Sequence, residues 1–177
     1  MLTLNSASSD LLVIDFQTRL MPAIHDSDAV ISNAFSLIEA ARYLNLPLTY
    51  TEQNPEKLGH TLTKLAPYPG EVLHKMTFDA LRTPKVAGHI DGTNAIVVAG
   101  CEAHVCVLQT VLGLIDAGRQ VFVVADAVGS RTPQNRRAAL ERMARHGAEI
   151  VTTEMVIFEW LGSAEHPSFR DILKLVK

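Results

Sequence analysis

Short apolar runs rich in β-branched residues alternate along the chain with longer segments in which apolar residues recur at helical spacing. The short runs are typical of buried strands, and the longer segments are typical of helices with one buried face. The runs predict strands at residues 11–15, 46–53, 71–75, 94–100, 120–126 and 148–154. The longer segments predict helices at residues 29–44, 105–117, 133–147 and 167–176, and a helix over 79–89 that is interrupted near Pro84.

The segment after residue 131 carries the clearest helix boundaries in the chain. Thr132 is a suitable N-cap, Pro133 suits the first helical position, and Gly147 suits the C-terminal end. By contrast, residues 54–70 form a polar stretch with proline and glycine between two predicted strands. We expect a loop there.

Strands that alternate with helices are typical of a mostly parallel sheet, because parallel strands need crossover connections that cover its faces. The pattern therefore predicts an α/β protein with a three-layer α/β/α, Rossmann-like fold. We expect a six-stranded parallel sheet with the strand order 3-2-1-4-5-6. In such sheets ligands bind beyond the carboxyl ends of the strands, so candidate functional residues are those that end or follow strands.

Length and composition indicate one globular domain over residues 1–177. Hydrophobic residues make up 47% of the chain and charged residues 20%, and the net charge is -3. Because the basic residues are scattered, we expect a small-molecule substrate and neither nucleic acid nor a membrane as partner. The N-terminus lacks a signal-peptide pattern, and polar residues interrupt the apolar stretches before they could span a bilayer. We therefore expect a cytoplasmic protein.

Three predicted strand ends carry residues suited to nucleophilic catalysis. Asp15 ends the first strand, Lys75 ends the third, and Cys106 opens the helix after the fourth. A thiol attacks as the thiolate. A helix N-terminus and a nearby cation stabilise the thiolate, and a nearby base can accept the thiol proton. Each residue also has a simpler interpretation: a turn cap for Asp15, a solvated side chain for Lys75 and core packing for Cys106. Cys101, inside an apolar run, is expected to be a small core residue.

The segment after the first strand argues against a nucleotide cofactor. A dinucleotide-binding fold places a glycine-rich turn there, where backbone amides approach a pyrophosphate. Here the segment is DFQTRLMP, which contains no glycine. No cofactor is expected.

The segments LLVIDFQ, HKMTFDAL and GCEAHVCVLQTVLGLIDAGRQVFVVADAVGSR resemble the isochorismatase-like cysteine hydrolase superfamily, which includes nicotinamidases and carbamoyl-amide hydrolases. The resemblance extends from the first strand to the last helix and is strongest for the isochorismatase domain-containing protein subgroup. It implies a catalytic triad of Asp15, Lys75 and Cys106. It also implies a hydrolase that acts on a small amide, carbamoyl or related carbonyl compound through a thioester, and a homo-oligomer.

The resemblance further implies a cis peptide bond between Cys101 and Glu102. In the family this bond contributes to an oxyanion hole, which here would consist of the backbone amides of Glu102 and Cys106. Ala103 is a further candidate for the substrate pocket; it stands where many amidases of the superfamily have threonine, so it cannot make the substrate contact of that hydroxyl. His104 is a candidate for facing the pocket or a partner subunit, and the simpler interpretation is an exposed residue in the first helical turn.

Three further apolar residues lie close to the triad in the sequence. Phe16 and Leu20 follow Asp15, and Phe78 follows Lys75. All three are candidates for an apolar pocket wall. Core packing is the equal alternative.

The metal site of the related nicotinamidases has no counterpart in this chain. Those enzymes carry an Asp-x-His motif after the second strand and a further histidine, which together bind a divalent metal. Thr51 and Gln53 occupy the motif positions here, so no metal is expected. His60 lies in the following loop, where an isolated histidine is expected to be a solvated side chain.

Two other functions remain open. The first is a non-catalytic scaffold or interaction protein that retains the fold. The second is a redox couple of Cys101 and Cys106, although the two do not form a Cys-x-x-Cys motif. Cys106 also argues against the vinyl-ether cleavage of the true isochorismatases, which lack this cysteine.

Overall fold

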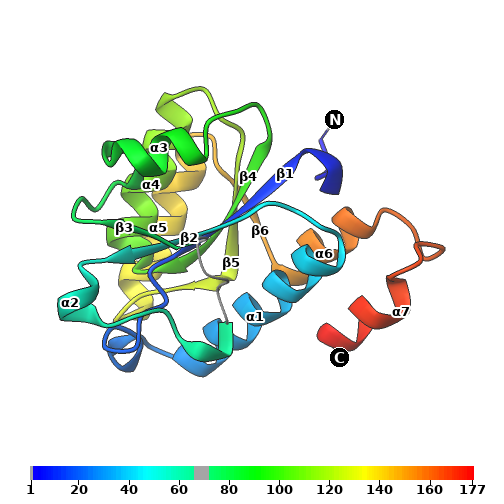
Figure 1. The fold of residues 1–177 in the computed structure, drawn as a ribbon, viewed down its shortest axis with the longest axis horizontal. Coiled ribbons are helices and arrows are strands. Elements are labelled where there is room, and N and C mark those ends of the chain that lie inside the picture. Colours follow the sequence, from blue (N-terminus) through cyan, green and yellow to red (C-terminus); the bar gives the residue numbers. More distant parts are fainter. Residues whose placement is uncertain (1, 66–71) are drawn as a thin grey trace.

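The computed structural model describes residues 2–65 and 72–177 (Figure 1). Within these residues the strands form one sheet in the order β3-β2-β1-β4-β5-β6, and neighbouring strands are parallel. This confirms the predicted parallel sheet and its strand order. The strands are β1 (Ser9–Ile14), β2 (Leu48–Gln53), β3 (Val72–Lys75), β4 (Ala95–Cys101), β5 (Val121–Gly129) and β6 (Glu149–Val151).

Helices cover both faces of the sheet, which confirms the predicted three layers (Figure 1). One apolar core lies between the sheet and α1, α6 and α7, and a second lies between the opposite face and α3, α4 and α5. The α-helices are α1 (Ser27–Tyr43), α2 (Pro55–Leu58), α3 (Pro84–His89), α4 (Leu108–Asp116), α5 (Pro133–Arg145), α6 (Thr153–Leu161) and α7 (Phe169–Ile172).

The predicted strand at 148–154 is wrong in its second half. Strand β6 ends at Val151, and helix α6 begins at Thr153. The side chain of Thr152 accepts a hydrogen bond from the backbone amide of Met155 and caps the helix. Gly162, with a φ of 65°, ends it in the left-handed conformation that glycine tolerates. The apolar residues between these caps pack on the core as a helix.

Other predicted boundaries shift as well. The helix expected at 105–117 is split into a π-helical turn, Ala103–Val107, and α4. The loop expected at 54–70 contains the short helix α2 and a 3-10 turn, Thr63–Leu65; its end and Glu71 of the third predicted strand lie outside the described residues. The helix expected at 167–176 is shorter, because α7 is followed by a 3-10 turn. The predicted N-cap of α5 is confirmed, since Thr132 Oγ1 accepts a hydrogen bond from the Asn135 amide.

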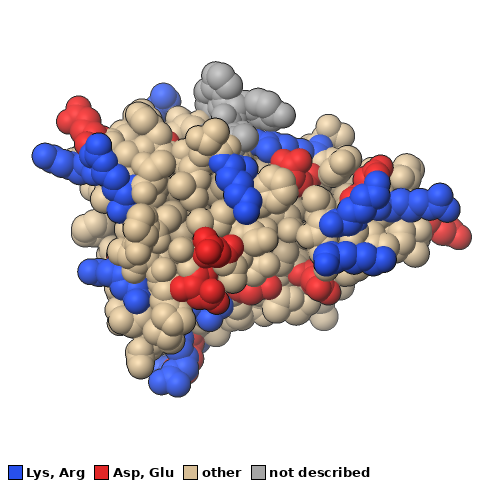
Figure 2. Space-filling model, turned by 90° about the horizontal axis from the view of Figure 1, so that it is seen from below, with Lys and Arg blue, Asp and Glu red and all other residues tan. Residues whose placement is uncertain are grey.

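Charge is mixed on the face shown in Figure 2, where acidic and basic side chains are interspersed with uncharged ones. That face therefore presents no continuous basic surface of the kind that binds a nucleic-acid backbone. Across the described part of the chain, no helix combines the length and the apolar character needed to cross a bilayer.

Gly100 lets β4 approach β1 where the two strands end. A Cβ atom added at Gly100 would lie 2.6 Å from both the Cβ atom and the carbonyl oxygen of Ile14. Such a contact is too short to be relieved by a side-chain rotation, because one of its partners is backbone. Since Ile14 precedes Asp15 and Gly100 precedes Cys101, this close approach sets the distance between two segments of the candidate site.

We expect Gly100→Ala to destabilise the fold by about 1–3 kcal/mol, the usual effect of overpacking a core. The matched control is Gly88→Ala in α3, where an added Cβ meets nothing within 4 Å. That variant should gain about 0.5–1 kcal/mol, because alanine favours a helix over glycine. Urea denaturation followed by circular dichroism measures both. Equal stability of Gly100→Ala and the wild type would contradict the proposed close packing.

Candidate active site

Asp15 and Lys75 form a buried ion pair at the carboxyl end of the sheet. Lys75 Nζ lies 2.7 Å from Asp15 Oδ2, and both side chains have 0% exposure. Asp15 directly follows β1 with a φ of 54°, a left-handed conformation that aspartate tolerates better than most residues. Lys75 is the last residue of β3. The structure therefore excludes the solvated-lysine interpretation.

Strand β2 lies between these two strands and supplies the remaining partners of the ion pair. Thr51 donates a hydrogen bond of 2.7 Å to Asp15 Oδ1, and Gln53 Oε1 accepts one of 2.9 Å from Lys75 Nζ. Both carboxylate oxygens of Asp15 are thereby engaged. In the sequence, Thr51 and Gln53 occupy the positions of metal ligands, and the place of Gln53 at the end of the second predicted strand is the signal for this role.

Cys106 lies in the π-helical turn that joins β4 to α4, and 6% of the residue is exposed. The backbone carbonyl of Glu102 accepts hydrogen bonds from the amides of both Val105 and Val107, and these two bonds hold the start of the turn. The Cys106 thiol lies near enough to Asp15 and Lys75 for the charges of both to act on its pKa. The three residues predicted as a triad, from three separate strand ends, therefore come together.

Burial raises the pKa of the Cys106 thiol to about 12. The negative charge of Asp15 also raises this pKa, whereas the positive charge of Lys75 lowers it. At neutral pH the thiol is thus protonated beside a carboxylate. The cation and the helix start do not by themselves produce a thiolate, so attack by this sulfur requires transfer of its proton to a base.

Cys101 has a different environment. It is fully buried at the end of β4, and burial raises the pKa of its thiol above the ordinary value. Both cysteines are free, so the structure shows no disulfide between them. The peptide bond between Cys101 and Glu102 is cis. Cys101 occupies the core position expected of it.

Glu102 and His104 join the turn to the segment after β5. Arg131 Nε lies 2.9 Å from Glu102 Oε2. His104 Nδ1 lies 3.1 Å from Ser130 Oγ, and its Nε2 lies 3.3 Å from Asn135 Nδ2. His104 is half-buried within this network and is not the freely exposed residue of the simpler interpretation. Arg131 carried no signal in the sequence, because its partner is distant along the chain.

The other pocket candidates divide by exposure. Phe16 and Ala103 have no exposed surface, and Phe16 packs in the core beneath α1, which favours its core-packing alternative. Leu20 is half-buried against the same core. Phe78 is 51% exposed and lies on the surface beyond Lys75.

His60 is exposed but not isolated. Its Nδ1 lies 3.1 Å from Oε2 of Glu52, a buried residue of β2, and His74 Nε2 lies 3.3 Å from the same oxygen. Burial acts to raise the pKa of Glu52, but hydrogen bonds from Thr61 and His60 outweigh it and hold the pKa below its ordinary value. Within residues 2–65 and 72–177, no group of three or more histidine, cysteine, aspartate or glutamate side chains is arranged to hold a metal ion.

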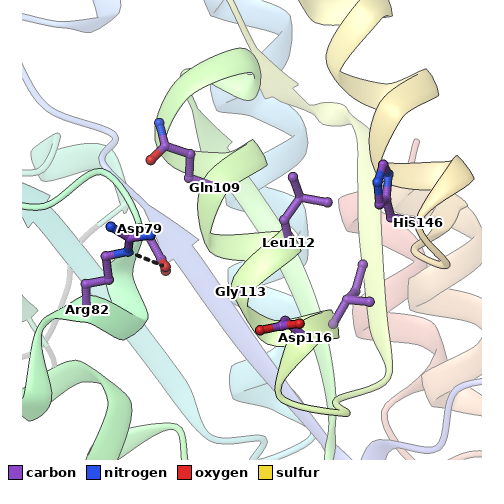
Figure 3. A pocket seen from close by; sticks show the side chains of 8 residues that line it. Asp79, Arg82, Gln109, Leu112, Gly113, Asp116 and His146 are labelled. Atoms are coloured by element: carbon purple, nitrogen blue, oxygen red, sulfur yellow. Dashed lines mark ion pairs between the residues drawn. The ribbon is translucent and has the colours of Figure 1, made fainter.

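Two cavities lie near the segment after β3. One, of about 320 Å³, is lined by Lys75 together with Pro55, Met76, Thr77 and Pro84, among others. The other, of about 470 Å³, lies over α4, with Asp79, Gln109, Asp116 and His146 among its lining residues (Figure 3). Of these two cavities only the first is lined by a residue of the predicted triad, Lys75, whose side chain is itself wholly buried.

The family model of the isochorismatase domain matches residues 9–155. The chain belongs to the isochorismatase family. This family member is 36% identical to isochorismatase domain-containing protein 1 of Danio rerio over 98% of its own length, and it spans 62% of the length of that protein. It is also 35% identical to isochorismatase domain-containing protein 2 of Xenopus laevis, and the alignment covers 98% of this chain and 85% of that protein.

Solved structures of the same fold are also similar in sequence. A MAR1 ribonuclease from Caenorhabditis elegans has a TM-score of 0.91 and 34% identity, over 98% of this chain and 92% of that one. The YcaC protein of Escherichia coli is described as an octameric hydrolase of unknown specificity. It has a TM-score of 0.89 and 25% identity, over 98% of this chain and 96% of that one. The YcaC protein of Pseudomonas aeruginosa, solved with hexane-2,5-diol and covalent acrylamide, has a TM-score of 0.87 and 25% identity over 98% and 91%.

Removing either partner of the ion pair should move the thiol pKa of this isochorismatase family member in opposite directions. Asp15→Asn removes a charge that raises the pKa of Cys106, so the pKa falls below about 12. Lys75→Met removes the charge that lowers it, so the pKa rises. The rate of labelling by iodoacetamide should therefore begin to increase with pH at a lower pH in the first variant and at a higher pH in the second.

The measurement is the pH dependence of labelling, followed by intact-protein mass spectrometry in a Cys101→Ser background so that one thiol is counted. Circular dichroism confirms that each variant is folded. Superimposable pH profiles for the three proteins would contradict an electrostatic coupling of the pair to the thiol.

Proposed function

We propose that this protein is a metal-independent cysteine hydrolase that cleaves a small amide, carbamoyl or related carbonyl compound. The observation that carries the proposal is the fully buried carboxylate–ammonium pair of Asp15 and Lys75, whose charges act on the nearby Cys106 thiol. A buried carboxylate beside a protonated thiol is suited to act as its general base.

In the proposed reaction, Asp15 takes the proton of Cys106 as the sulfur attacks the carbonyl carbon. The resulting oxyanion is stabilised by the backbone amides of Glu102 and Cys106. Asp15 then gives its proton to the leaving nitrogen, and ammonia or an amine departs. Water, deprotonated by Asp15, hydrolyses the thioester and releases the acid.

Lys75 has a supporting role in this scheme. Its ammonium holds Asp15 Oδ2 at 2.7 Å, which keeps the carboxylate in place while the proton moves. It also opposes the accumulation of negative charge when the thiol loses its proton. Thr51 fixes the other carboxylate oxygen, so Asp15 has little freedom to turn away.

Two relatives support the proposal. The Escherichia coli relative is described as a hydrolase, and the Pseudomonas aeruginosa relative holds acrylamide covalently. Acrylamide is an electrophile that carries an amide, so a covalent adduct with it is consistent with a nucleophile in a site of this fold. The octameric state of the Escherichia coli relative likewise supports a homo-oligomer for this chain.

The proposal predicts that the protein releases ammonia from at least one member of a panel of small amides, ureas and carbamates. Cys106→Ala should reduce the release to the rate of a blank without protein, because the nucleophile is gone. Cys101→Ala, the matched loss of the other cysteine, should retain most of the activity. Activity that survives in Cys106→Ala would contradict the assigned nucleophile.

A further inference from the structure

Glu102 makes two kinds of contact, one through its backbone carbonyl and one through its carboxylate. Its backbone carbonyl accepts from the amides of Val105 and Val107 at 3.0 and 3.2 Å, so Glu102 holds the turn that carries Cys106. Its carboxylate, on a side chain that is 11% exposed, lies 2.9 Å from Arg131 Nε and 3.8 Å from His104 Nε2. The ion pair thus restrains the side chain of the residue whose backbone carbonyl anchors the turn.

The partners of Glu102 come from the segment between β5 and α5. Arg131 follows Ser130, which is fully buried and lies 3.1 Å from His104 Nδ1. The carbonyl of Ser130 accepts a hydrogen bond of 3.0 Å from the His25 amide, which ties this segment to the loop after β1. The carboxylate of Glu102 is thus held from a part of the chain that is itself fixed.

We propose that Glu102 and Arg131 are positioning residues, whose ion pair holds the Cys106-bearing turn so that its backbone amides can bind an oxyanion. The inference rests on the proposed function, since it concerns the same site. It deepens that function by assigning a role to a charged pair outside the triad. His104 Nε2 lies 3.8 Å from the same carboxylate oxygen that Arg131 contacts.

The pair is better suited to positioning than to stability. The Arg131 side chain is 58% exposed and that of Glu102 11%, so solvent screens the arginine and the pair contributes only modestly to the free energy of unfolding. An arginine hydrogen bond to a carboxylate nevertheless has a well-defined direction. Loss of the pair should therefore leave the protein folded and alter the alignment of the turn.

Two thiol reagents separate alignment of the amides from reactivity of the sulfur. With acrylamide, the Cys106 sulfur bonds to the terminal alkene carbon, the alkene electrons move to the amide oxygen as an enolate, and the thiol proton passes through Asp15 to the adjacent carbon. With iodoacetamide, the sulfur displaces iodide and no charge develops on the amide oxygen. Only the first reaction benefits from an oxyanion hole.

The test compares the labelling rates of Cys106 with both reagents at one pH, in a Cys101→Ser background. Arg131→Met and Glu102→Gln should lower the acrylamide rate by roughly tenfold to a hundredfold, as expected when a stabilising group is misplaced by a fraction of an ångström or more. The iodoacetamide rate and the melting temperature should stay near those of the wild type. Arg137→Met, which removes an exposed arginine of α5, is the matched control and should change neither rate.

The outcomes are distinguishable. If both variants keep the wild-type ratio of acrylamide to iodoacetamide rates, the positioning role is overturned and the proposed nucleophile still stands. A parallel fall of both rates would also overturn it, because sulfur reactivity and not oxyanion binding would have changed. If wild-type Cys106 reacts with neither reagent, the proposed function itself fails.

Discussion

The buried ion pair between Asp15 and Lys75 is the interaction on which the candidate site depends. Either charge alone would be costly to bury, and removing one partner of such a pair typically costs about 3–5 kcal/mol. Together they lie 2.7 Å apart without exposure, and β2 completes their hydrogen bonds through Thr51 and Gln53. The order of the sheet, with β2 between β1 and β3, is what makes this arrangement possible.

The same pair defines the state of the thiol. Burial and the Asp15 charge raise the pKa of Cys106 to about 12, while Lys75 opposes them. A thiol in this environment keeps its proton until a substrate is attacked, and the carboxylate beside it can accept that proton. The proposed reaction therefore relies on a local proton transfer and not on a stable thiolate, which distinguishes it from that of cysteines with a strongly lowered pKa.

Much of this arrangement could be predicted from the sequence because strand ends are visible in it. The run before Asp15 is apolar, and a shorter run with Val72 and Leu73 precedes Lys75, so both residues could be placed at the carboxyl edge of a parallel sheet. Helix α6 was missed because apolar residues continue after β6, and short apolar runs do not distinguish strand from helix. The contacts of Arg131 with Glu102 and of Thr51 with Asp15 join residues that are far apart in the chain. They depend on tertiary packing, which the spacing of residues in a single sequence does not reveal.

The most direct test of the account is the detection of a covalent intermediate. The protein would be mixed with an amide that it hydrolyses, quenched with acid within one turnover, and analysed by peptide mass spectrometry. The account predicts an added mass equal to the acyl group on the peptide that contains Cys106, which disappears as turnover is completed. Hydrolysis of that amide with no acylated peptide at any time, or with the acyl group on Cys101, would contradict it.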